Sequence, residues 1–189
     1  YATAGSRIVL RFFGGWGYAP DSVHSPYFET IGYHGGVPMG GELPPNLDGA
    51  PTFMVQAMKD PDAANLDQVQ IIKGWIDATG ETHERVFDIA GDANNGASVD
   101  PNTCSPAGTG AAQLCTVWQD PDFDPEQRAV YYARAFETPS CRFSTRICNA
   151  SPPDERPSSC SDPNIPQVIQ DRAWTSPIWY TPSRRLAGP

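Results

Sequence analysis

The sequence Leu66-Asp-Gln-Val-Gln-Ile-Ile-Lys-Gly-Trp75 decides the fold class of this chain. Its apolar and polar residues alternate approximately, and its β-branched and aromatic side chains are typical of a β-strand. Asp77-Ala-Thr-Gly80 follows with residues that favour a turn, and Glu81 to Ile89 supplies a second strand-like run. We therefore predict a β-hairpin over residues 66–89.

Further strand-like segments lie on both sides of this hairpin, each rich in β-branched or aromatic residues. They span residues 7–13, 52–58, 114–118 and 129–137, whereas residues 168–180 are expected to dock on the body through their aromatic side chains. We expect 114–118 and 129–137 to pair with each other across the acidic turn at 120–126. Six or so strands separated by turns predict an all-β fold, an immunoglobulin-like β-sandwich.

Glycine and proline divide the rest of the chain into irregular segments. The 189 residues include 17 Gly and 20 Pro, which disfavour long helices. Residues 14–49 are expected to form a long loop packed by its own aromatic side chains, and residues 138–166 a disulfide-stapled excursion. The length suits one domain with long loops.

The net charge of −9 excludes some partners. An acidic chain repels phosphate backbones and anionic lipid, so we expect neither nucleic acid nor a membrane surface as a partner. No apolar run approaches the roughly 20 residues that span a bilayer, so membrane insertion is not expected.

Five cysteines lie in the second half of the chain, in Ser-, Pro-, Asn- and Gly-rich segments: Cys104, Cys115, Cys141, Cys148 and Cys160. Their spacings contain no C-x-x-C, and the three histidines lie far upstream, so disulfides are favoured over a metal site. Disulfides indicate a periplasmic or secreted protein. Because five is odd, one thiol stays free or pairs outside the chain.

The chain begins at Tyr1 and almost at once enters an apolar run. It has neither an initiator Met nor a signal peptide, so we expect a piece of a larger exported protein. The alternative is a mature N-terminus left by signal cleavage.

The acidic turn contains Asp120, Asp122, Asp124 and Glu126, and alternating carboxylates are ligands that calcium prefers. An EF-hand loop would need Gly at its sixth position and Glu at its twelfth, where this sequence has Pro and Tyr. A plain acidic turn between strands is therefore favoured over a calcium site. The Asp- and Asn-rich loop at 88–100 has the same two interpretations.

Catalytic signals are weak throughout. His83 lies in the returning strand of the hairpin, where an exposed histidine is common, and His24 and His34 lie in the long loop. The chain contains no G-x-S-x-G nucleophile turn and no phosphate-binding P-loop. We therefore predict no complete catalytic site and assign no catalytic residue.

Six motifs resemble one known family. The resemblance covers nearly the whole chain and is to the C-terminal third of bacterial exported proteins of unknown function. These proteins are similar to the PHP (polymerase and histidinol phosphatase) metal-dependent phosphoesterases and to carbaryl-hydrolase-like proteins. The motifs are Tyr1-Ala-Thr-Ala-Gly-Ser-Arg-Ile8, Leu10-Arg-Phe-Phe-Gly-Gly-Trp16, Gln70-Ile-Ile-Lys-Gly-Trp75, Val117-Trp-Gln-Asp-Pro-Asp-Phe-Asp-Pro125, Val130-Tyr-Tyr-Ala-Arg134 and Ala173-Trp-Thr-Ser-Pro-Ile-Trp-Tyr180.

This resemblance implies that a divalent metal is bound by an N-terminal catalytic domain of the same protein, ahead of Tyr1. Thr3, Gly5 and Arg7 would then border the active site of the intact protein. Residues 1–13 would form the exit segment and first strand, residues 14–137 the sandwich body, and residues 138–189 the excursion and an aromatic segment that docks on the sandwich.

The resemblance also suggests a first disulfide between Cys104 and Cys115, and leaves a second pair unassigned among Cys141, Cys148 and Cys160.

Three functional hypotheses follow from these observations. The first is an accessory β-sandwich of a PHP-like, phosphoesterase-type hydrolase, inactive when isolated. The second is a free-standing secreted module that binds a sugar or peptide through the aromatic loop at residues 16–33. The third is a structural domain stabilised by calcium at Asp120, Asp122 and Asp124.

Overall fold

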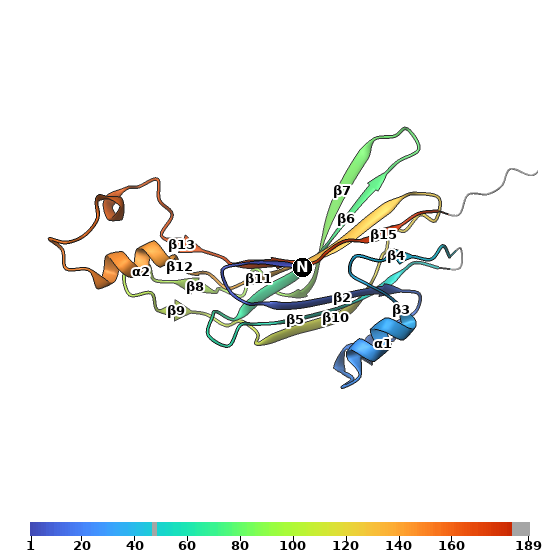
Figure 1. Cartoon of the computed structure of the whole chain (residues 1–189), viewed down its shortest axis with the longest axis horizontal. Helices are drawn as coiled ribbons and strands as arrows, with labels where there is room; N and C mark the ends of the chain where they lie inside the picture. Colours follow the sequence, from blue (N-terminus) through green and yellow to red (C-terminus); the bar gives the residue numbers. More distant parts are fainter. Residues whose placement is uncertain (47–48, 183–189) are drawn as a thin grey trace, which may run out of the picture.

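Two β-sheets packed against each other form the body of the protein in the computed structural model, which describes residues 1–46 and 49–182 (Figure 1). The all-β sandwich predicted from the sequence is confirmed. Two short strand pairs and four short helices or helical turns lie outside the two sheets.

The larger sheet has seven strands with β11 at its centre. One edge of β11 pairs with β6, which pairs with β7, and the other edge pairs with β14 and β15. β1 extends the sheet beyond β14, and β4 runs parallel to β15. The strands are β1 (Ala2–Ala4), β4 (Glu42–Leu43), β6 (Leu66–Ile76), β7 (Thr82–Gly91), β11 (Ala129–Glu137), β14 (Arg172–Trp174) and β15 (Ile178–Tyr180).

The smaller sheet has four antiparallel strands in the order β10-β5-β2-β3. They are β2 (Val9–Gly15), β3 (Gly36–Pro38), β5 (Thr52–Met58) and β10 (Gln113–Gln119). β5 lies in the interior of this sheet, and its first five residues are all buried except Gln56.

The core lies between the two sheets and is built from alternate residues of their strands. Phe12 of β2 stacks on Phe53 of β5, and Phe53 packs against Tyr131 of β11 with ring centroids 4.5 Å apart. Ile71 and Ile178 are fully buried beside them. Each such side chain contributes about 1.5–3 kcal/mol through burial, so this interface holds the sandwich together.

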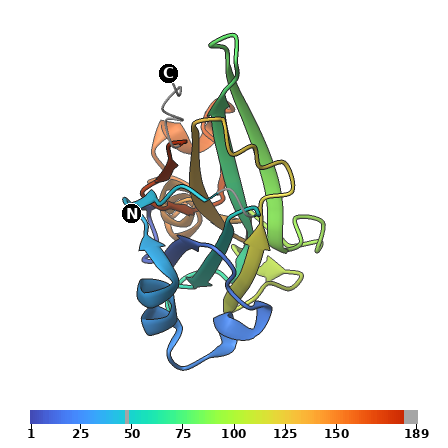
Figure 2. The same ribbon diagram turned by 90° about the vertical axis from the view of Figure 1, so that its right-hand side faces the viewer.

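The remaining helices and short strands lie outside the two sheets. α2 lies in an excursion at one end, and the tip of the β6–β7 hairpin extends beyond the sandwich at the other (Figure 1). Seen from the side, the hairpin tip and α1 lie at opposite borders of the molecule (Figure 2). The elements are η1 (Pro20–His24), α1 (Phe28–Gly35), β8 (Ser98–Val99), β9 (Pro106–Ala107), β12 (Ser140–Cys141), α2 (Phe143–Ala150), η2 (Ser158–Ser161) and β13 (Val168–Ile169).

Two sequence predictions about these elements are wrong. Residues 14–49, expected as a loop, contain α1, because Phe28 and Gly32 pack onto the smaller sheet beside Phe13. The strands at 114–118 and 129–137 exist but do not pair with each other. The first joins β5 in the smaller sheet and the second joins β6 in the larger one, so the acidic turn carries the chain between sheets.

Two disulfides join Cys104 to Cys141 and Cys148 to Cys160, both in the excursion region. The predicted Cys104–Cys115 pair is wrong, because Cys115 lies inside β10 opposite Gln56, whereas Cys104 lies in the β8–β9 loop beside β12. Cys115 is a free, half-buried thiol. Two disulfides are typical of a protein that folds in an oxidising compartment.

None of the helices in residues 1–46 and 49–182 is long and apolar enough to cross a membrane. The division into residues 1–13, 14–137 and 138–189 stays a prediction. Residues 47–48 and 183–189, which belong to its second and third parts, lie outside the described residues.

Candidate functional site

A cavity of about 790 Å³ lies where the N-terminal segment, the end of β11 and the excursion meet. We name it the Glu137 pocket. Its polar and charged lining includes Ser6, Lys59, Asp62, Asn65, Thr138, Glu137, Arg146 and Asp171, and the Cys104–Cys141 disulfide forms part of its wall. A cavity of this size lined by ionisable groups is a candidate binding site.

Glu137 is the most unusual residue of this pocket. It ends β11 at a shift in the strand register, and its side chain is buried, with 1% of the residue exposed. Its Oε1 makes no hydrogen bond, and the neighbouring Ser6 Oγ makes none either. Burial raises the pKa of Glu137 most; the adjacent Ser6 side chain lowers it, the charges of Asp171 and Asp60 raise it, and Lys59 lowers it slightly, so that the pKa is raised on balance.

Asp171 lies beside Glu137, whose backbone N–H donates a 2.9 Å hydrogen bond to the Asp171 carbonyl. Burial raises the pKa of the Asp171 carboxyl as well. Its carboxylate packs against Gly5, where an added Cβ would lie 2.7 Å from Oδ2. Gly5 also has a φ of +89°, so this position requires glycine for both space and backbone conformation.

Arg7 neutralises two other acids close to the pocket. Its Nε lies 2.9 Å from Asp60 Oδ2 and its Nη2 lies 3.0 Å from Asp62 Oδ2. The Arg7 backbone N–H also donates to Asp60. The Arg7 hydrogen bonds hold the pKa of Asp60 well below its usual range. Glu137 and Asp171 receive no such partner from Arg7.

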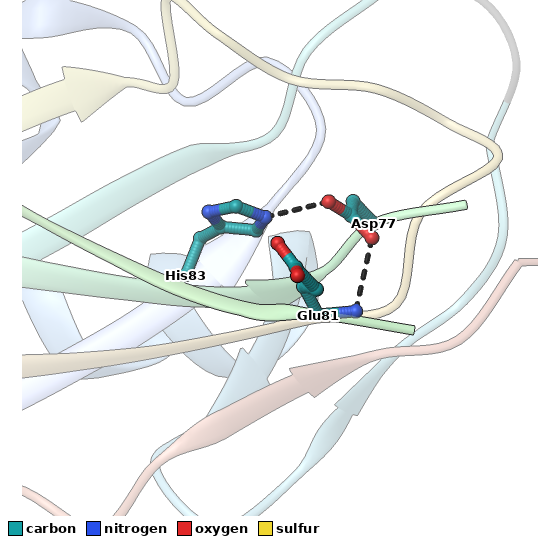
Figure 3. Close-up of side chains that lie close together, drawn as sticks. All are labelled: Asp77, Glu81 and His83. Carbon is teal, nitrogen blue, oxygen red and sulfur yellow. Dashed lines mark hydrogen bonds and ion pairs between the residues drawn. The ribbon is translucent and has the colours of Figure 1, made fainter. Parts of the chain in front are cut away.

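A second group of ionisable side chains lies at the tip of the β6–β7 hairpin (Figure 3). Asp77, Glu81 and His83 place one ligand atom each within 4.8 Å of one another, a spacing that could hold a metal ion. Asp77 is already engaged, because Oδ2 lies 2.7 Å from His83 Nε2 and Oδ1 accepts from Thr79 and from the Glu81 N–H. The cluster therefore stabilises the turn.

The pKa of Asp77 lies well below its usual range, first because of the Thr79 side-chain hydrogen bond and then because of His83. The sequence predicts His83 as an ordinary exposed histidine and does not predict its pairing with Asp77. The signal that could have found it is the Asp77–His83 spacing across a predicted four-residue turn, which brings the two side chains to the same end of a hairpin.

A buried charge network joins the two sheets. Lys73 Nζ lies 2.6 Å from Asp120 Oδ2, and the two side chains are 3% and 0% exposed. The Tyr131 hydroxyl donates to the same carboxylate at 2.7 Å, and Lys73 also donates to the Asp122 carbonyl. Burial, and then the Asp120 charge, raises the pKa of Tyr131 far above its usual value.

The outer face of the larger sheet is partly apolar. Tyr131, Ala133 and Ala135 point into the core, so the residues between them point outward. Strand register places Val130 next to Gly74 on one side and Trp179 on the other. A second cavity of about 380 Å³ lies here. We define the outer face by Gly74, Ile76, Val86, Val130, Tyr132 and Trp179.

Three of these outer-face residues are strongly exposed for apolar side chains: Ile76 at 45%, Val86 at 44% and Trp179 at 52%. Charged residues lie around them. Glu84 of β7 and Glu42 of β4 lie at the two ends of the row that contains Gly74, Val130 and Trp179. The face is therefore an apolar strip with a polar rim.

The sequence matches the DUF3604 family, whose members are described as proteins of unknown function, over residues 1–182. The chain belongs to the DUF3604 family. No curated protein and no solved structure matches it. The DUF3604 description assigns no activity.

In this DUF3604 chain two of the three N-terminal candidates, Gly5 and Arg7, contact residues that line the Glu137 pocket. Gly5 contacts Asp171, and Arg7 binds Asp60 and Asp62. Thr3 lies in β1 opposite Ala173 and is exposed. That these residues border an active site of a larger protein stays a prediction.

The three calcium candidates of the DUF3604 chain have separate partners. Asp120 binds Lys73, Asp122 forms an ion pair with Arg85, and Asp124 accepts a hydrogen bond from a backbone N–H in its own turn. Two of the three carboxylates are thus neutralised by cationic side chains. The structure does not bring them together as a set of free ligands.

The aromatic loop at residues 16–33 is mostly turned inward. Tyr18 and Phe28 are buried, and Trp16 packs against Phe123 and Tyr180. Among the aromatic residues of this segment, only Tyr27 and Tyr33 are strongly exposed, at 68% and 63%. This arrangement supports packing of the DUF3604 sandwich more than an open aromatic platform.

The other two histidines lie on separate helical elements. His24 ends η1 and lies 3.8 Å from the Cys115 sulfur, measured from Nδ1. His34 is in the last turn of α1, with its Nδ1 2.8 Å from the Thr30 carbonyl oxygen. Within the described residues, the histidines of this DUF3604 chain therefore do not assemble into one site.

Proposed function

We propose that this chain is the accessory β-sandwich of an exported, PHP-like metal-dependent hydrolase, phosphoesterase-like in activity. In this proposal the sandwich packs against the catalytic domain of the same protein and has no complete active site of its own. The observation that carries the proposal is the apolar outer face. Large exposed apolar patches with polar rims mark surfaces that contact another protein body.

The path of the N-terminal segment favours the catalytic domain as the occupant of this face. β1 lies at the edge of the larger sheet, and its register opposite β14 turns Ala2 and Ala4 to the same side as Trp174 and Arg172. That is the outer side, because Ala173 between them is buried in the core. A domain joined ahead of Tyr1 would start from the edge of the same sheet, within reach of this face.

The metal chemistry of such a hydrolase does not fit the described residues of this chain. Among them, the one group of three metal-ligating side chains is the hairpin-tip cluster, whose Asp77 is engaged in its own turn. The three histidines lie on different elements. We therefore assign the metal to the catalytic domain and derive no catalytic step for this chain.

The two disulfides support the exported part of the proposal. Such bonds persist in the periplasm or outside the cell and are rare in the cytosol. The pair Cys104–Cys141 closes a separation of 37 residues and ties the β8–β9 loop to the end of the sandwich. We propose a periplasmic or secreted location on this basis.

An activity comparison tests the proposal. The purified chain is assayed with p-nitrophenyl phosphate, bis-p-nitrophenyl phosphate and 1-naphthyl acetate, each with added Mn²⁺ or Zn²⁺, beside the full-length protein purified from its native cells. We expect turnover from the full-length protein and none from this chain. Metal-dependent turnover by this chain alone would overturn the proposal, and so would a native protein no larger than 20.5 kDa.

A further inference from the structure

A buried and unpaired carboxylate that lines a cavity is the feature of this molecule that points most directly to a ligand. Glu137 is 1% exposed, its Oε1 has no hydrogen-bond partner, and it lines the Glu137 pocket. Nearly all buried polar atoms in folded proteins are paired, so an unpaired one needs an explanation. A hydrogen-bond donor supplied by a ligand would satisfy this carboxylate.

The charges around Glu137 favour a positively charged ligand. Asp171 and Asp60 are its acidic neighbours, and Lys59 is the cation that acts on it. The Lys59 ammonium, however, hydrogen-bonds to Asn65 Oδ1 at 3.2 Å. Asp60 is neutralised by Arg7. Arg146 also lines the pocket, but within residues 1–46 and 49–182 neither Glu137 nor Asp171 forms an ion pair with a cationic side chain.

The donor set favours an organic cation over a metal ion. In residues 1–46 and 49–182, the carboxylates of Glu137 and Asp171 are not part of any group of three metal-ligating side chains with close ligand atoms. A metal ion would need more ligands than two carboxylates. An ammonium or guanidinium group needs only hydrogen-bond acceptors and negative charge, which Glu137, Asp171 and Ser6 Oγ offer.

We propose that the Glu137 pocket binds a small organic cation, an alkylammonium or guanidinium compound, whose N–H donates a hydrogen bond to Glu137 Oε1. Asp171 supplies the second negative charge. The pocket also has an apolar wall that can contact the carbon chain of such a ligand, formed by Val99, the Cys104–Cys141 disulfide, Pro106, Ala107 and Pro139. This inference does not depend on the accessory role proposed above.

Isothermal titration calorimetry with cadaverine tests the proposal. Cadaverine carries two alkylammonium groups, and 1,5-pentanediol is its uncharged analogue. We expect saturable one-site binding of cadaverine by the wild-type chain and at least tenfold weaker binding of the diol. Glu137→Gln keeps the shape of the side chain and removes its charge, and it should weaken cadaverine binding at least tenfold.

Glu155→Gln is the matched control, because Glu155 is exposed in the excursion and does not line the pocket. It removes the same charge from an acidic protein, so it should leave cadaverine binding unchanged. Equal affinity of the Glu137→Gln and Glu155→Gln variants would overturn the proposal, because binding would then reflect the overall charge of −9. Absence of saturable binding by the folded wild-type chain would also overturn it.

A second variant and a pH series keep the test decisive if Glu137→Gln does not fold. Asp171→Asn should also weaken cadaverine binding. Affinity of the wild-type chain should fall as the pH is lowered from about 8 to about 4, because the pocket carboxylates become protonated while alkylammonium groups stay charged. Those acids are Glu137 and Asp171, whose pKa values burial raises, and the cations that line the same pocket are Lys59 and Arg146. An affinity unaffected by both changes would refute the assignment.

The source of the alkylammonium group is decided by a parallel titration with acetyl-Gly-Lys-Gly-amide. Binding of cadaverine but not of the peptide would identify a free amine as the ligand. Binding of the peptide at similar affinity would identify a lysine side chain. Both results support an alkylammonium site, and failure of both probes contradicts it.

Discussion

Replacing Lys73 by methionine tests whether the buried charge network holds the two sheets in place. Lys73 belongs to β6 in the larger sheet, and Asp120 directly follows β10 in the smaller one. The substitution preserves most of the side-chain volume and removes the charge. It leaves the Asp120 carboxylate, whose side chain is 0% exposed, without its cation.

The expected magnitude follows from this burial. Removing one partner of a buried ion pair costs about 3–5 kcal/mol, because the remaining charge stays desolvated and uncompensated. Asp120 keeps two hydrogen bonds, from the Tyr131 hydroxyl and the Asp122 N–H, which places the cost nearer the lower limit. We expect the free energy of unfolding to fall by about 3 kcal/mol.

Urea unfolding followed by tryptophan fluorescence measures this change as a shift of the midpoint. Arg85→Met is the matched control, because Arg85 pairs with Asp122 on the surface, with side chains 56% and 48% exposed. Surface pairs contribute below about 1 kcal/mol. The double substitution Lys73→Met with Asp120→Asn should recover part of the loss. Equal costs for Lys73→Met and Arg85→Met would refute the reasoning.

Three further predictions concern the Glu137 pocket and its wall. Gly5→Ala should lower the free energy of unfolding by about 1–3 kcal/mol in chemical denaturation, because it forces a left-handed backbone and a contact with Asp171. A Glu137 carboxyl with a raised pKa stabilises the fold at low pH, and this contribution is lost as pH rises through the raised pKa. Thermal melts across pH should therefore show a stability loss that Glu137→Gln lacks, and parallel curves would contradict it. Replacing Cys104 and Cys141 by serine should cost about 4 kcal/mol, the entropy of a loop closed over 37 residues, measured by urea unfolding; a cost near zero would show that this bond does not constrain the chain.

The strands could be predicted from the sequence where one face of the sheet is buried. Ala129–Glu137 alternates buried and half-buried residues over its first six positions, and its Val130-Tyr-Tyr132 run of β-branched and aromatic residues indicates a strand. The pairing partners could not be predicted, because the acidic turn after β10 resembles a hairpin turn. The pairing of β10 with β5 and of β11 with β6 shows that the chain changes sheets there.

Helix α1 could not be predicted from the local sequence, because its glycines are more typical of a loop than of a helix. Gly32 and Gly35 suggested a loop, but they allow the helix to approach its neighbours closely. A Cβ at Gly32 would lie 2.6 Å from the Phe13 ring, and one at Gly35 would lie 2.6 Å from the Tyr18 ring. Tertiary packing therefore decides the structure of this segment, against its local preference.

The Glu137 pocket had no signal in the sequence except the motif around Gly5 and Arg7. Its lining comes from segments near residues 6, 59–65, 104–110, 137–146 and 171, which are distant in the chain. A glutamate at the end of a strand is unremarkable until its burial and missing hydrogen bond are known. The disulfide pairing likewise depended on which loops meet in space.

Hydroxyl-radical footprinting of the outer face tests the accessory role most directly. Trp179 is 52% exposed in this chain, and Tyr27, at 68%, lies just before α1 beside the smaller sheet and serves as the internal control. We predict that Trp179 is labelled in the isolated chain and protected in the full-length native protein, whereas Tyr27 is labelled in both. Equal labelling of Trp179 in the two proteins would contradict the proposed docking of the sandwich on a catalytic domain.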